Sequence, residues 1–318
     1  MARILDKRLI FVTGKGGVGK STVAAALGVV AARAGKRTVV CEVAQQERMS
    51  ALFHQKGVGY QETEIAENLF AFSIDPQKAL EEYLLLQIKV KPLYDLMFRN
   101  RIFTYFAAAT PGMRELVTIG KVWELSQLDR RVKKGVKYDL VIVDAQATGH
   151  GIAMLRTPKT FGDIARVGPI KRQAETIYEF ITDPSLTSVC AVALPEEMPV
   201  NETLDFKRRL KDELELKLDR VFMNGIYPVL FNEREASSIE LRYEEEVAGS
   251  DRSGVAIARR AALRAAVAEH GRAHAHHEQV ERLKEGAKQE PVELPFLFSP
   301  EIDMDAIERL ADILEEAL

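Results

Sequence analysis

A nine-residue string near the N-terminus, GKGGVGKST at residues 14–22, limits the possible folds of this chain more than any other feature. It matches the pattern GxxxxGK[ST], in which glycines let the backbone curl so that successive N–H groups point at one anion. A compact apolar run, residues 8–13, precedes the string, and an Ala-rich segment with helical spacing, residues 21–33, follows it. A strand, a glycine-rich loop and a helix in this order predict a phosphate-binding loop in an α/β fold.

Apolar and β-branched runs recur along the rest of the chain and read as further strands or extended segments, at residues 38–43, 69–74, 138–144, 187–194, 220–224 and 291–298. Segments with helical spacing separate most of them. This alternation predicts a doubly wound, mostly parallel sheet of the P-loop NTPase type. We expect a single domain over residues 1–318, with an inserted helical lobe at about 77–134 and a charged helical segment at about 233–289.

The composition argues against several classes of function. The net charge is −3, without the basic excess that marks a nucleic-acid binder. Cys41 and Cys190 lie far apart, which favours a reducing compartment over a disulfide. The apolar run at residues 9–12 is too short for a signal peptide, and no stretch reaches the length of a membrane-spanning helix. We therefore expect a cytoplasmic protein that neither binds nucleic acid nor inserts into a membrane.

The residue types of the loop assign roles in binding ATP and Mg²⁺. Lys20 is expected to bridge the β- and γ-phosphates, and the Ser21 hydroxyl to bind Mg²⁺. Asp144 ends the strand YDLVIVD, where a P-loop protein keeps an acid directed at magnesium, partly through water. The alternative, a chance glycine-rich turn, is disfavoured by the flanking strand and helix. The expected nucleotide-binding residues of the loop are Gly14, Gly16, Gly17, Val18, Gly19, Lys20, Ser21 and Thr22.

Three further strings, DAQATGH at 144–150, LPEEMPVNET at 194–203 and MNGIYP at 223–228, follow the loop in order. With them the chain resembles the family of the arsenite-pump ATPase and the tail-anchored-protein-targeting ATPase, and looks closest to its bacterial anion-transporting branch. In that family the lysine at position 15 makes the loop a deviant Walker A motif. The resemblance implies that Lys15 reaches the nucleotide of a facing subunit, as an arginine finger does, so a dimer is expected.

The resemblance also assigns residues beyond the loop. It implies that Asp144 and Gly149 form a second switch segment, with Gly149 in a flexible loop, and that Asn224 reads the adenine edge. Residues 296–300 would lie over the base. His150 either points to the site or partner subunit or is an ordinary polar residue. Guanine is not expected, because no [NT]KxD sequence follows a late strand.

The chain departs from the family where the first switch should be. Ala44 stands in place of the aspartate that orients the attacking water, and alanine can neither accept a proton nor orient water. Glu42, Gln45 and Glu47 are candidate substitutes. We favour Glu42, acting on magnesium through a water, because it ends a strand expected beside the phosphate loop. The family's zinc-binding CxxC is absent, so a dimer held by zinc is not expected.

These features predict a Mg²⁺-dependent dimeric switch ATPase whose nucleotide state controls a client or partner, with hydrolysis that is slow or partner-dependent. The alternative is a weakly hydrolysing or non-hydrolysing regulatory subunit that pairs with a related ATPase. A positioning ATPase is disfavoured, because the C-terminal helix is acidic. The apolar stretch at 84–113 is either a client groove or, as we favour, core packing. The histidines at 270, 274, 276 and 277 are expected on a solvated helix face rather than at a metal.

Overall fold

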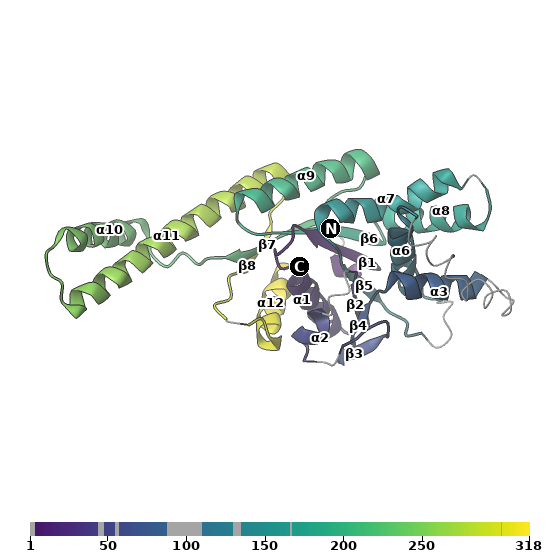
Figure 1. Ribbon diagram of the computed structural model, residues 1–318, viewed down its shortest axis with the longest axis horizontal. Coiled ribbons are helices and arrows are strands. Elements are labelled where there is room, and N and C mark those ends of the chain that lie inside the picture. Colours follow the sequence, from purple (N-terminus) through teal and green to yellow (C-terminus); the bar gives the residue numbers. More distant parts are fainter. Residues whose placement is uncertain are drawn as a thin grey trace.

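The computed structural model describes residues 4–43, 48–54, 57–87, 110–129, 135–165, 167–299 and 301–318. Its centre is an eight-stranded sheet in the order β3-β4-β2-β5-β1-β6-β7-β8 (Figure 1). Neighbouring strands are parallel except β3, which runs antiparallel to β4 at one edge. The predicted doubly wound, mostly parallel sheet is therefore confirmed. The strands are β1 (Leu9–Gly14), β2 (Thr38–Glu42), β3 (Thr63–Ala66), β4 (Leu69–Ser73), β5 (Leu140–Asp144), β6 (Thr187–Ala193), β7 (Arg220–Ile226) and β8 (Val292–Pro295).

Helices cover both faces of this sheet. They are preceded by a short 3₁₀ turn, Ile4–Asp6. The helices among the described residues are α1 (Lys20–Arg33), α2 (Arg48–Leu52), α3 (Pro76–Gln87), α6 (Met113–Leu125), α7 (Thr148–Ile164), α8 (Pro169–Thr182), α9 (Glu197–Leu214), α10 (Glu233–Ala248), α11 (Gly254–Ala287) and α12 (Met304–Ala317). None of them is both long and apolar enough to cross a bilayer.

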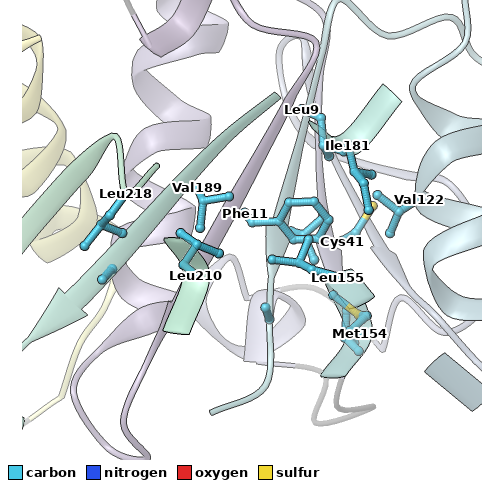
Figure 2. Packing of buried hydrophobic residues seen from close by; sticks show 14 of the residues in the cluster. Leu9, Phe11, Cys41, Val122, Met154, Leu155, Ile181, Val189, Leu210 and Leu218 are labelled. Carbon is cyan, nitrogen blue, oxygen red and sulfur yellow. The ribbon is translucent and has the colours of Figure 1, made fainter. Parts of the chain in front are cut away.

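The central strands are buried at almost every position, as strands covered on both faces must be. Alternate residues of β1 enter different cores, because successive side chains of a strand point to opposite faces. Ile10 packs with α1 and α12, whereas Phe11 packs with α6, α7 and α9. Figure 2 shows Phe11 beside Leu155 of α7 in the second of these cores. The helical layers thus hold the carboxyl end of β1 from both sides.

The described part of the predicted helical lobe consists of α3 and α6. The ammonium of Lys121 in α6 lies 2.7 Å from Oε1 of Glu82 in α3 and 3.1 Å from Oε2 of Glu124. Only 7% of Lys121 is exposed, so a buried ion cluster joins the two helices. Most of the apolar stretch at 84–113 lies outside the described residues, and its predicted groove or core stays a prediction.

The charged segment at 233–289 forms two helices, α10 and α11, joined by a turn at 249–253. Figure 1 shows α10 and the first half of α11 projecting from the sheet as an antiparallel hairpin, while the second half of α11 lies along α9. We call residues 233–272 the arm. A capping box at Asn232 begins α10, and the Ser253 hydroxyl caps α11, so local sequence sets both helix starts.

Candidate phosphate site between β1, β5 and β7

Residues 14–20 curl between the end of β1 and the start of α1, as the sequence predicts. Two glycines are required there by packing. A Cβ atom on Gly14 would collide with the carbonyl oxygen of Val192, and one on Gly19 would collide with the side-chain amide of Asn224. Gly19 also has a φ of 92°, which favours glycine. The loop is therefore held between β6 and β7, with the N-terminus of α1 opening toward its centre.

Lys20 is the first residue of α1, and its side chain lies over the loop. Its ammonium donates a hydrogen bond to the Lys15 carbonyl oxygen at 2.7 Å. Burial lowers the pKa of Lys20, while Asp144 acts to raise it and Arg48 acts to lower it. A half-buried cation held by the loop's own backbone is placed to meet phosphate oxygens.

Ser21 and Asp144 meet directly beside Lys20. The Ser21 hydroxyl donates to Oδ2 of Asp144 at 2.6 Å. Asp144 is the last residue of β5, which pairs with β1 so that Asp144 lies opposite Val12. Burial raises the pKa of the Asp144 carboxyl, and the Ser21 hydrogen bond and Lys20 act in the opposite direction. A hydroxyl and a carboxylate at this spacing are the oxygen donors that Mg²⁺ prefers.

Arg48 is a member of the site that the sequence did not predict. Its guanidinium donates to the Ser21 hydroxyl at 3.4 Å. Arg48 is the first residue of α2. The preceding residues 44–47, which include Ala44, Gln45 and Glu47, lie outside the described part of the chain. A lone arginine after a switch segment carries no motif, so only its spatial proximity to Ser21 reveals it.

Glu42 ends β2, as predicted, and lies opposite Asp144 where β2 pairs with β5. We expected its strand beside the phosphate loop, but the order β2-β5-β1 puts β5 between them. Strand order depends on packing across the sheet and cannot be read from one run of residues. The buried carboxylate of Glu42 accepts hydrogen bonds from the backbone N–H groups of Arg48 at 2.6 Å and Met49 at 3.2 Å. Glu42 thereby anchors the helix that carries Arg48.

Lys15 makes its contacts within its own chain. Its ammonium lies 3.1 Å from Oε1 of Glu202 and 3.7 Å from the sulfur of Met198. Both partners belong to α9, which follows β6. The Lys15 side chain is 28% exposed and Glu202 is 39% exposed, so solvent screens this ion pair.

Asn224 and Gly149 flank the loop from β7 and α7. The side-chain amide of Asn224 donates to the Val18 carbonyl oxygen at 2.9 Å and so fixes the loop from the side. We expected Gly149 in a flexible loop, but it lies in the first turn of α7. The Thr13 hydroxyl donates to the Gln146 carbonyl oxygen at 3.0 Å and ties the preceding segment to β1. Gly149 and His150 are both exposed there.

Aromatic side chains gather just past the ends of β7 and β8. The ring of Tyr227 stacks on Phe296, with centroids 4.6 Å apart, and meets the edge of Phe298. Tyr227 also donates its backbone N–H to Nδ1 of His276 in α11 at 3.2 Å, and Arg272 lies 4.8 Å from its ring centroid. We expected His276 on a solvated helix face, but this was wrong, because His276 contacts Tyr227. Burial lowers the pKa of His276, and Glu196 opposes this shift.

A match to a family model over residues 7–173, which is more than half of the chain, decides the family of this chain. A model of the anion-transporting ATPases matches residues 7–173, which contain the phosphate loop, Asp144 and Gly149. The chain belongs to the anion-transporting ATPase family. This confirms the resemblance drawn from the sequence motifs and assigns the chain to the ATPases.

Relatives of this ATPase carry consistent names. It is 33% identical over 233 residues to ATPase BagA of Mycobacterium tuberculosis, a match that covers 71% of this chain and 67% of the relative. It is 32% identical over 154 residues to ATPase ASNA1 homolog 1 of Paramecium tetraurelia, covering 47% of this chain and 43% of the relative. It is 31% identical over 159 residues to ATPase GET3 of Podospora anserina, covering 49% and 45%.

Proposed function

We propose that this ATPase is a cytoplasmic, Mg²⁺-dependent switch in which ATP joins two subunits and so controls the binding of a client or partner. The observation that carries the proposal is the Ser21–Asp144 hydrogen bond of 2.6 Å beside the half-buried ammonium of Lys20. These are the oxygen donors and the cation that a magnesium nucleotide requires at a phosphate loop.

Each residue has a defined task in this proposal. The loop amides and Lys20 would hold the phosphates, and Ser21 and Asp144 would hold Mg²⁺, which supplies charge neutralisation on the phosphates when bound. Asn224, packed against Val18, would sit beside the base, with Phe296 at its open side. Arg48 would supply a second positive charge next to Ser21. Glu42 contributes by holding the start of α2, which positions Arg48.

The dimer follows from Lys15. Its ammonium lies beside α9 of its own chain and is not needed for the contacts that hold the loop together. A lysine at this edge could meet the phosphates of a facing subunit, where it would stabilise the charge of the transferring phosphoryl group. Because these contacts exist only when two subunits close on ATP, nucleotide binding would shift the equilibrium toward the closed dimer.

Sedimentation of the purified chain tests this proposal. With Mg²⁺ and a non-hydrolysable ATP analogue we expect a dimer, and with ADP or after chelation of Mg²⁺ a monomer. Lys15→Ala should bind nucleotide but stay monomeric. The same sedimentation coefficient under all three conditions would refute the switch.

A weakly hydrolysing regulatory subunit of a heterodimer is the second candidate, and Ala44 favours it, since the family places a water-orienting aspartate at that position. Single-turnover hydrolysis separates the two candidates. A chain that hydrolyses bound ATP by itself as a homodimer is the switch ATPase. A chain that hydrolyses ATP only when mixed with a related ATPase is the regulatory subunit.

A further inference from the structure

The arm leaves the body of the molecule at the same edge of the sheet as the phosphate loop. Strands β1, β6 and β7 are parallel, so the end of β7 at Ile226 and the loop after Gly14 lie at one edge. The chain then passes Tyr227 and enters α10 at Glu233. The arm therefore begins beside the candidate nucleotide site.

The course of α11 shows how far the arm reaches. Near its end α11 lies beside the start of β7, because Gln289, which follows the helix, donates to the Leu218 carbonyl oxygen. His276 lies beside Tyr227, just past the end of β7. The residues of α11 before His276 thus extend beyond the sheet edge, as Figure 1 shows. At 1.5 Å per residue, residues 254–273 span about 30 Å.

The arm has almost no core of its own. No residue of α10 is buried, and in α11 only Ala256 is buried before Ala273. Four large apolar side chains of the arm are more than half exposed: Leu241, Val247, Val255 and Ile257. A formed helical pair with exposed apolar side chains, three of them within four residues of the turn at 249–253, marks a surface that another molecule covers.

Charge identifies the kind of molecule. Helix α10 carries six glutamates and two arginines, whereas residues 254–273 of α11 carry four arginines and one glutamate. The acidic helix disfavours a membrane surface or a nucleic acid. Arg259 of α11 pairs with Glu246 of α10 at 2.7 Å inside the arm. The charges beyond this pair still leave one acidic and one basic helix, which are complementary to each other across a two-fold symmetric contact.

We propose that the arm docks on a second copy of this chain. This inference rests on the proposed ATP-dependent dimer. A second copy that accepts Lys15 must approach the sheet edge that holds the phosphate loop, and an arm reaching about 30 Å past that edge then lies against it. The exposed apolar side chains supply the buried part of the contact, and the opposite charges of α10 and α11 set its register.

The first test replaces Leu241, Val247, Val255 and Ile257 together by serine. The control is Ile164→Ser, an equally exposed apolar residue at the far end of α7. Sedimentation equilibrium with Mg²⁺ and a non-hydrolysable ATP analogue gives the dimer Kd, and a fluorescent ATP analogue gives the nucleotide Kd of the monomer. We expect the dimer Kd of the arm variant to rise at least tenfold with its nucleotide Kd and Tm unchanged, and the control to stay within twofold.

The outcomes separate the two proposals. If wild type dimerises with ATP and the arm variant dimerises equally well, the arm inference is wrong and the ATP-dependent dimer stands. If wild type stays monomeric with ATP, both are wrong.

A second measurement does not depend on the stability of the arm variant. Cys41 and Cys190 are both buried, so Ser250→Cys at the tip of the arm can be labelled selectively with a fluorophore. Adding unlabelled wild-type chain with Mg²⁺ and the ATP analogue should shift its emission, and adding it with ADP should not. No shift under conditions where the dimer forms would overturn the inference.

Discussion

The ammonium of Lys15 lies 3.1 Å from the Glu202 carboxylate of the same chain. The cation proposed to reach a facing subunit is thus held against its own α9 in this structure. Leaving Glu202 is then part of the cost of closing the dimer. An exposed ion pair of this kind contributes about 0.2–1 kcal/mol, so the effect is small but measurable.

We predict that Glu202→Gln strengthens the ATP-dependent dimer. Removing the carboxylate frees Lys15 in both subunits, and a gain of up to about 1 kcal/mol from each corresponds to as much as roughly a thirtyfold lower dimer Kd. Glu197→Gln, another exposed change on α9, is the matched control and should leave the dimer Kd unchanged. Sedimentation equilibrium with the ATP analogue measures both. A weaker dimer in Glu202→Gln would show that this carboxylate serves the closed state instead.

The contacts around Lys15 show what the sequence could predict. The loop and Ser21 follow from a local pattern, because a strand, its turn and the next helix place neighbouring residues together. Asp144 follows from the apolar strand that it ends, since a P-loop protein keeps an acid at that place. Glu202 and Arg48 depend on which distant elements pack against the loop, and neither carries a motif. The strand that ends at Glu42 was expected beside the phosphate loop, and this was wrong for the same reason, since β5 lies between β2 and β1. The action of Glu42 on magnesium stays a prediction.

The arm was predictable only in part. Its composition indicated helices over 233–289, but not that they separate into a projecting pair. The capping residues Asn232 and Ser253 are visible in the sequence and could have marked the two helix starts. Nothing local shows that α10 finds no core to cover. That property arises because α11 is far longer than β7, along which its second half lies.

Asp144→Asn should affect stability and function in opposite directions. Burial raises the pKa of the Asp144 carboxyl in the folded chain, so ionised Asp144 destabilises the nucleotide-free protein once the pH exceeds the usual pKa of an aspartate. Asparagine keeps a hydrogen-bond acceptor for Ser21 without the buried charge. We expect a higher Tm at pH 7 without nucleotide, by thermal unfolding, together with loss of the Mg²⁺-dependent gain in ATP affinity.

The pH dependence of wild type gives the same test without a substitution. As the pH falls toward the raised pKa of Asp144, the carboxyl takes up a proton and loses its charge for Mg²⁺. The Mg²⁺-dependent part of ATP affinity should therefore begin to fall at a pH above that at which ordinary aspartates titrate. Asp144→Asn should show no such dependence. An equal Mg²⁺ response in variant and wild type would exclude Asp144 from the metal site.

Lys121→Met should destabilise the contact between α3 and α6. The Lys121 ammonium is 2.7 Å from Glu82 and 3.1 Å from Glu124, and methionine would leave these partly buried carboxylates without their cation. Removing one partner of a buried ion cluster costs about 3–5 kcal/mol. We expect a clear fall in Tm, measured by circular dichroism. Adding Glu82→Gln and Glu124→Gln should recover part of the loss, and a Tm equal to wild type in Lys121→Met would contradict this reading.

The two lysines of the phosphate loop give the most direct test of the account. At a chain concentration far below the dimer Kd, fluorescence titration with a non-hydrolysable ATP analogue and Mg²⁺ should show that Lys20→Ala loses about tenfold to a hundredfold in affinity, since a charge-assisted contact contributes about 1.5–3 kcal/mol. Lys15→Ala should change the same Kd by no more than about twofold, because its proposed target is the other subunit's nucleotide. Unchanged ATP affinity in Lys20→Ala would contradict the assignment of this loop as the nucleotide site.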